Sequence, residues 1–300
     1  MKYAVALDIG GTKIEGVLFD ASYRQIKKKR VNFAKNKADS SVKISRQEVL
    51  DMISDLIVEL KQGRKISGIG ISIPDIITKD GAISGGSKIK CLSDFAIAAY
   101  FRKKFRCRVE AANDADCFAL GEAKAGAAKN CKNVVGVIWG TGVGAGIVID
   151  GKRFSGTTGS AGEFGHNVID PNGPKERTGL RGTVEGFAGG PNIIRNYKKQ
   201  DGRMKSPDIL DLYKSEEPAA KKAMDSAIEH LSIGLASLMN IINPDIIFIG
   251  GGLSNLPVYA QLNKRTRKYA FSAIKKSVKI VKNKLGDSAG VYGAAALVLD

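Results

Sequence analysis

The sequence predicts an α/β protein made of two related halves, and three observations support this prediction. Segments with strand and helix spacing alternate along the chain in two rounds, which is typical of α/β proteins. The 300 residues, 43% of them hydrophobic, can bury a sizeable core, and this length favours two domains over one. The glycine-rich segments 9–20 and 139–150 align at a constant offset of 130 residues, with Gly10 on Gly140. A repeat of this length indicates a duplicated domain.

The first half is predicted to begin with two strands in residues 3–20, joined by the turn GGTK. Apolar residues at helical spacing in RQEVLDMISDLIVELKQG predict a helix that ends near Gly63. The segment ISGIGISI reads as a buried strand ended by Pro74. A second helix from about Ser93 and a short strand at 107–111 complete this half.

The second half repeats the pattern. Residues 133–150 are predicted to form another pair of strands around glycines, followed by a loop at 151–192. A long helix is expected from about Pro218 to Ile242, where the dipeptide NP interrupts it. The segment DIIFIG then makes a strand, Gly250–Gly252 turn the chain, and SAGVYGAAALVL closes it as a helix of small residues.

The charge balance limits the classes of partner. Lysine and arginine outnumber aspartate and glutamate by 47 to 30, and the formal net charge is +17. Such a charge can indicate nucleic-acid binding, but no helix-turn-helix prefix, aromatic-laced basic strip or zinc-finger spacing accompanies it. We therefore expect a solvated basic surface on a protein whose ligands are anions, with no nucleic-acid partner.

The cysteines and the apolar runs indicate the compartment. Four scattered cysteines without a CxxC pair predict reduced thiols in a cytoplasmic protein. No apolar run approaches membrane-spanning length, and MKYAVAL meets Asp8 too early for a signal peptide, so no membrane partner is expected.

The two glycine-rich turns are candidate phosphate sites. Glycines in a turn let backbone N–H groups approach an anion without a Cβ in the way. Thr12 and Thr141 add hydroxyls and Lys13 adds a positive charge, which suits a polyphosphate; two ordinary tight hairpins are the alternative. Neither turn is a GxxxxGK[ST] loop or a strand-to-helix GxGxxG turn. Asp8 lies at the end of the first strand, beside the turn. It suits a magnesium contact through water, and a turn-forming aspartate is the alternative.

The stretch AANDADCFALGEA places Asn113 and Asp114 ahead of a run of good helix formers. The positive end of a helix favours an ionised carboxylate, so a helix N-cap is the ordinary interpretation of Asp114. Beside phosphate-binding turns, the same carboxylate is suited to accept a proton from a hydroxyl that attacks a γ-phosphate. Asp114 is therefore also a candidate general base for phosphoryl transfer.

A third cluster lies in GSAGEFGH and RGTVEGF, which supply Glu163, His166 and Glu185. Carboxylates and an imidazole in one pocket suit a polyhydroxylated ligand, because each acidic oxygen can accept a sugar O–H. A polar loop with structural hydrogen bonds is the alternative.

Together, LDIGGTK, AANDADCFALGEA, WGTGVGAGIVIDG, GSAGEFGH and DIIFIGGGLS resemble, in content and order, the ROK family of sugar kinases and sugar-responsive repressors. The resemblance runs from Ala4 to about Gly293. It implies the actin-like, ribonuclease-H-type fold of two α/β domains around a cleft, and a homodimer. We expect residues 1–112 plus 287–300 to form a small N-terminal domain and residues 113–286 a large C-terminal domain.

By position, the resemblance implies a role for each candidate residue. Asp114 matches the catalytic base that deprotonates the sugar 6-hydroxyl, and Asn113 matches a residue that hydrogen-bonds the sugar. Further sugar-binding positions of the family fall on or near Ser87, Glu163, His166 and Glu185. The phosphate and adenosine segments of the family match Gly10, Gly11, Thr12, Lys13, Gly140, Thr141, Gly142, Val143, Gly144, Gly250, Gly251 and Gly252.

The sequence departs from the family at its zinc motif, CxCGxxGCxE. The matching segment ERTGLRGTVE has Glu176, Thr178 and Thr183 in place of the three cysteines. Because zinc prefers thiolate and imidazole ligands, we expect no structural zinc. We expect instead that hydrogen bonds among His166, Glu176 and Thr178 hold this loop.

Two further departures, Asp116 in place of a frequent asparagine and Asp75 in place of a usual glycine, predict an altered sugar preference. The leading prediction is an ATP- and Mg²⁺-dependent hexose kinase that makes a sugar 6-phosphate from glucose, mannose or an N-acetylhexosamine. A fructokinase, a non-catalytic sugar sensor, and a kinase with another phosphoryl donor such as polyphosphate are the alternatives.

Overall fold

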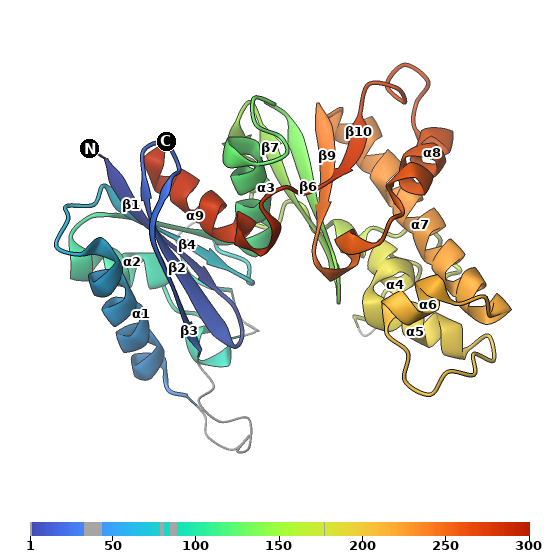
Figure 1. Ribbon diagram of the computed structural model, residues 1–300, viewed down its shortest axis with the longest axis horizontal. Coiled ribbons are helices and arrows are strands. Elements are labelled where there is room, and N and C mark those ends of the chain that lie inside the picture. The colour runs from blue at the N-terminus through green and yellow to red at the C-terminus, as the bar shows by residue number, and fades with distance from the viewer. Residues whose placement is uncertain (1, 33–43, 79–80, 85–88, 177) are drawn as a thin grey trace. The chain divides into compact units, whose positions relative to one another are not determined.

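The computed structural model describes residues 2–32, 44–78, 81–84, 89–176 and 178–300 (Figure 1). The chain divides into two compact units, each built on a five-stranded sheet. The first unit contains residues 1–129, 153–161 and 287–300, and the second contains residues 130–152 and 162–286.

The sheet of the first unit has the order β3-β2-β1-β4-β5. Its strands are β1 (Tyr3–Ile9), β2 (Lys13–Asp20), β3 (Gln25–Asn32), β4 (Gly68–Ile73) and β5 (Arg108–Asn113). The first three strands pair antiparallel, whereas β4 is parallel to both β1 and β5. The predicted hairpin around GGTK is therefore confirmed as β1–β2.

The sheet of the second unit has the same order, β8-β7-β6-β9-β10. Its strands are β6 (Val134–Trp139), β7 (Val143–Ile149), β8 (Lys152–Arg153), β9 (Ile246–Gly250) and β10 (Lys279–Lys282). Strands β6 and β7 form an antiparallel hairpin, and β9 runs parallel to both β6 and β10. The matching order confirms the duplication that the aligned hairpins predict.

Helices cover both faces of the first sheet. Helices α1 (Arg46–Lys61) and α2 (Ile97–Phe105) pack on one face, and α9 (Ala289–Leu299) packs on the other, beside α3 (Asp114–Ala125). Helix α1 ends one residue before the left-handed Gln62, close to the predicted stop. None of the helices in the described ranges combines the length and hydropathy needed to cross a bilayer.

Alternation along β1 decides which side chains face α9. Val5 and Leu7 join the core under α1 and α2, whereas Ala4 and Ala6 join the core under α9. The small residues let α9 approach closely: a Cβ on Gly70 would lie 1.7 Å from the carbonyl oxygen of Ala294. Asp8 continues the α9-facing series at the end of the strand.

Helix α3 belongs to the first unit because its backbone packs directly against α9. A Cβ on Gly121 would lie 2.2 Å from the carbonyl oxygen of Ala289, and one on Gly293 would lie 1.8 Å from that of Cys117. The sequence-based domain boundary at residue 112 separates α3 from this packing, whereas the compact units keep residues 113–129 with the first sheet.

The second unit carries a set of helices around its own core. These are α4 (Val184–Ala188), α5 (Gly190–Lys198), α6 (Ile209–Lys214), α7 (Pro218–Ile242) and α8 (Tyr259–Tyr269). The predicted bounds of α7 are confirmed, whereas α4 and the start of α5 lie within residues 151–192, which we predicted as a loop.

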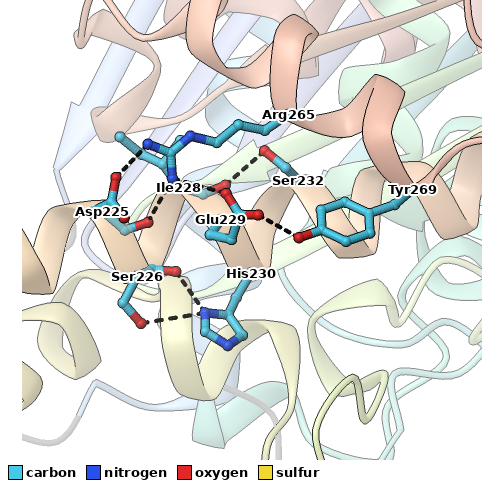
Figure 2. A network of polar contacts seen from close by, with 8 residues as sticks. All are labelled: Asp225, Ser226, Ile228, Glu229, His230, Ser232, Arg265 and Tyr269. Atoms are coloured by element: carbon cyan, nitrogen blue, oxygen red, sulfur yellow. Dashed lines mark hydrogen bonds and ion pairs between the residues drawn. The ribbon is translucent and has the colours of Figure 1, made fainter.

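Charged contacts tie α8 to α7 (Figure 2). Arg265 donates to Glu229 at 2.9 Å and pairs with Asp225, and Tyr269 donates its hydroxyl to Glu229. His230 lies on α7 at 2.7 Å from the carbonyl oxygen of Ser226 and stacks on Phe187 of α4.

Candidate active site

The candidate base lies at the junction of β5 and α3. Asn113 ends the strand and caps the helix, because its Oδ1 accepts from the N–H of Ala115 at 2.8 Å. Its amide also donates to the carbonyl oxygen of Asp75 at 3.3 Å. The N-cap role therefore belongs to Asn113. Asp114 occupies the first helical position, where the helix dipole favours its ionised form.

Asp8 lies in the same cluster of the first unit. Its Oδ1 accepts a hydrogen bond of 2.6 Å from the hydroxyl of Ser72 on the neighbouring strand β4. Burial, together with the charges of Asp114 and Glu15, raises the pKa of Asp8 to about 6, although the hydrogen bond from Ser72 and the charge of Lys13 lower it. Two carboxylates and a lysine that influence one another electrostatically form a centre suited to a metal–phosphate group.

The first glycine turn leaves its backbone open. Gly10 donates its N–H to the carbonyl oxygen of Lys13 at 2.9 Å, which closes the β1–β2 hairpin. A Cβ on Gly11 would meet no atom within 4 Å, and residues 11–13 are exposed. Residues 11–13 of this turn are therefore accessible from solvent.

The second glycine turn is enclosed by other segments of its unit. Glu185 on α4 accepts from the N–H of Val143 at 2.8 Å, and a Cβ on Gly142 would lie 2.6 Å from the same carboxylate. Gly190 donates to the carbonyl oxygen of Gly140 at 2.9 Å. A Cβ on Gly140 would lie 3.6 Å from the N–H nitrogen of Gly252, so the predicted turn at 250–252 joins this group.

The sequence does not predict the approach of Gly189 and Gly190 to this group. Both residues lie at the α4–α5 junction, and Pro191 follows at the start of α5. Two glycines followed by proline, typical of a chain that turns into a helix, were the available signal.

The three candidate sugar-binding residues all lie in the second unit. Glu163 precedes a short 3₁₀ turn that His166 ends, with 3.7 Å between Glu163 Oε2 and His166 Nε2. The Glu163 side chain is half exposed, and Glu185 holds the second glycine turn. Ser87 lies outside the described residues. The structure thus groups Asp8, Asn113 and Asp114 in one unit and these three residues in the other.

The loop that resembles the zinc segment is closed mainly by backbone hydrogen bonds. Glu176 donates its N–H to the carbonyl oxygen of Leu180 at 2.8 Å, and Gly182 donates to that of Pro174 at 3.0 Å. Thr183 caps α4 by accepting from the N–H of Gly186 at 2.9 Å.

The expected side-chain network of this loop forms only in part. Thr178 donates to Glu176 at 3.3 Å. His166 Nδ1 and the second carboxylate oxygen of Glu176 are buried and make no hydrogen bond within the described part of the chain. One imidazole, one carboxylate and hydroxyls do not fit zinc. No group of three or more histidine, cysteine, aspartate or glutamate side chains suited to a metal occurs among the described residues.

Comparison with known proteins places these features in a family. The model of the ROK family matches residues 4–300. The N-acetylgalactosamine kinase AgaK of Shewanella sp. (strain ANA-3) is 31% identical over 97% of this chain and 95% of its own length. The xylose repressor of Bacillus subtilis (strain 168) is 28% identical over 99% of this chain and 77% of its own length.

A solved structure gives the same result for the fold. The ROK hexokinase from Thermus thermophilus superposes with a TM-score of 0.87 at 28% identity and covers 99% of this chain and 97% of its own. This similarity agrees with the two sheets of matching strand order, and the fold is the actin-like ATPase fold that the family resemblance implies. With a family match across nearly its whole length and a kinase relative above 30% identity, the chain belongs to the ROK family.

Proposed function

We propose that the protein is an ATP- and Mg²⁺-dependent hexose kinase that phosphorylates the 6-hydroxyl of glucose, mannose or an N-acetylhexosamine. The observation that carries this proposal is the arrangement at the start of α3. Asn113 takes the capping role, and Asp114 lies in one electrostatic cluster with Asp8. The kinase relative at 31% identity acts, by its name, on an N-acetylhexosamine, which supports this substrate class.

The proposed chemistry assigns a proton transfer to Asp114. Its carboxylate accepts the proton of the sugar 6-hydroxyl as the O6–Pγ bond forms and the bond from Pγ to the β–γ bridging oxygen breaks, which releases ADP. Bound Mg²⁺ would neutralise the charge on the phosphates, and Asp8 would hold it through water. The N–H groups of the glycine turns at 10–13 and 140–144 would bind phosphate oxygens.

Sugar binding is assigned to the second unit and to Asn113. Glu163, His166 and Glu185 supply oxygen and nitrogen atoms for sugar hydroxyls. Glu185 also accepts from Val143 at 2.8 Å, so its side chain is held in place before a sugar arrives. This prior hydrogen bond links the proposed sugar contact to the second glycine turn.

The similarity to the xylose repressor over 99% of this chain favours a second candidate, a sugar-binding protein without kinase activity. One experiment separates the two. Purified protein is incubated with Mg²⁺, ATP and each of glucose, mannose, fructose, glucosamine, N-acetylglucosamine and N-acetylmannosamine, and ADP release is followed. A parallel series replaces ATP with polyphosphate.

Sugar-dependent ADP release that Asp114→Asn abolishes is the expected result, and it names the substrate. Fructose as the preferred acceptor would select the fructokinase alternative. Sugar binding by calorimetry, without turnover on either phosphoryl donor, would replace the kinase with the sugar-binding candidate.

A further inference from the structure

The basic strand β3 divides its side chains between two faces of the first sheet. On the face covered by α1, Lys27 and Lys29 pair with Glu59, whose side chain is 41% exposed. On the face covered by α9, Lys28 and Arg30 pair with Glu15, whose side chain is 5% exposed. The two glutamates have the same kind of partners from the same strand, but only Glu15 is buried.

Buried Glu15 joins the start of α9 to the sheet. Its Oε1 lies 2.8 Å from Lys28 Nζ and accepts from the hydroxyl of Ser288 at 3.1 Å. Lys28 also donates to Ser288 at 3.0 Å, and Arg30 donates to the second carboxylate oxygen of Glu15. These mutual contacts satisfy a carboxylate that would be costly to bury alone.

Ser288 directly precedes α9, and the first turn of this helix lies against Asp8. A Cβ on Gly290 would lie 3.0 Å from both Cγ and Oδ2 of the Asp8 carboxylate. Glu15 is also the cross-strand neighbour of Asp8 in the β1–β2 pair. Glu15 is thus connected to Asp8 twice, through the sheet and through Ser288.

We propose that Glu15 is a positioning residue for phosphoryl transfer: by accepting the hydroxyl of Ser288, it holds the first turn of α9 against the carboxylate of Asp8. The catalytic part of this proposal rests on the proposed kinase function. Without the Glu15–Ser288 contact, the start of α9 can move away from Asp8. The Asp8 carboxylate then loses the packing contact with the first turn of α9 that fixes its position. The affinity for the metal–nucleotide group falls as a result.

The matched control is Glu59, which pairs with two lysines of the same strand on the opposite face. Five variants form the test set: Glu15→Ala, Glu15→Gln, Ser288→Ala, Ser288→Thr and Glu59→Ala. The glutamine keeps an acceptor for Ser288 and the threonine keeps the hydroxyl, so both conservative changes retain the contact. Two readouts are used for each variant: hydrogen exchange of the peptide 287–295, and kcat and KM for the hexose and for MgATP.

We expect Glu15→Ala and Ser288→Ala to speed exchange at the start of α9 and to lower kcat/KM for MgATP about tenfold, with the hexose KM nearly unchanged. Glu15→Gln and Ser288→Thr should restore most of the loss. Glu59→Ala should stay within about twofold of the wild type, as an exposed ion pair contributes little.

Equal exchange and equal kinetics in Glu15→Ala and Glu59→Ala would overturn the proposal. So would faster exchange without a kinetic effect, because the contact would then be structural only. If Glu15→Ala does not fold, Ser288→Ala decides, since it removes a single hydroxyl. If the wild type turns over no sugar, the proposed kinase function is overturned instead. Hydrogen exchange then tests the Glu15–Ser288 contact by itself: unchanged exchange of the peptide 287–295 in Glu15→Ala and Ser288→Ala would overturn its role in holding α9.

Discussion

The two glycine-rich hairpins share a backbone plan and differ in the source of their charge. Hairpins β1–β2 and β6–β7 occupy matching places in sheets of the same strand order. In the first, Asp8 and Lys13 flank the turn, but the aligned positions of the second are the apolar Ile138 and Val143. There, a carboxylate comes from 42 residues away, as Glu185 accepts from the N–H of Val143.

This difference suits the two halves of a duplicated scaffold to two different proposed roles. The first hairpin carries ionised groups within its own strands, which suits contact with a metal and a proton in transfer. The second hairpin provides backbone N–H groups, and its carboxylate comes from Glu185 on α4. This arrangement suits the binding and orientation of a ligand. Changes at the first hairpin and its neighbours should therefore affect chemistry most, and changes at the second should affect affinity most.

The largest effect is expected for Asp114→Asn. An asparagine keeps the size of the side chain but cannot accept the sugar proton, so kcat should fall by about 10³-fold, within the range of general-base catalysis. Hexose affinity, measured by calorimetry, should change little. A variant that keeps more than a tenth of the wild-type kcat would remove Asp114 from the role of base.

A large effect on stability is expected at Asp8. Because its folded pKa is raised from 3.8 to about 6, the folded protein binds this proton more tightly than the unfolded chain. Asp8 therefore contributes stability that is present below pH 3.8 and lost as the pH rises through about 6. Asp8→Asn removes the buried charge and should stabilise the protein by up to about 3 kcal/mol at pH 7, while it lowers kcat.

The measurement is urea unfolding in Mg²⁺-free buffer at pH 7 and at pH 4. The gain from Asp8→Asn should shrink at the lower pH, where wild-type Asp8 is protonated. A gain that is the same at both pH values would show that burial of the charge is not its origin.

The hairpins and their glycines were predictable from sequence because their signals are local. Alternating apolar residues around glycines identify β1–β2 and β6–β7, and helical spacing gives the bounds of α7. Strand β3 was not predicted, because QIKKKRVN lacks an apolar alternation and reads as a solvated basic patch. Its strand conformation depends on pairing with β2 and on distant glutamates.

The sequence nominates candidate site residues, but it does not predict their contacts. Asp114 and Glu185 stay predictions drawn from the residue types and their order. The assignment of the N-cap to Asn113, the hydrogen bond from Val143 to Glu185, and the approach of Gly190 to Gly140 depend on tertiary packing. Short elements such as α4 give too weak a periodic signal to be separated from a loop.

A smaller effect is expected at the second hairpin for Gly142→Ala. The new Cβ would lie 2.6 Å from Glu185 Oε2, so the carboxylate must leave its position on Val143. The hexose KM should rise about tenfold while kcat changes less, because binding rather than proton transfer is disturbed. Gly144→Ala is the matched control for the hexose KM alone, since a Cβ there meets no atom within 4 Å. Its KM for MgATP is outside this control, because Gly144 belongs to the proposed phosphate turn. Equal sugar kinetics for the two variants would contradict the role of Glu185.

The smallest effect concerns how Glu185 is held. Thr183 caps α4 two residues earlier, and a lost cap costs about 1 kcal/mol, so Thr183→Ala should lower stability by that amount and raise the hexose KM modestly. Thr183→Ser keeps the capping oxygen and should behave as the wild type.

A chelator should leave both the melting temperature and the sugar affinity of the wild type unchanged, because the donor set of the loop at 176–185 does not fit zinc. The opposite outcome is one equivalent of zinc in metal analysis that can be removed only with loss of sugar binding. A metal would then hold Glu185 in place, and the second hairpin would be the one that depends on a metal.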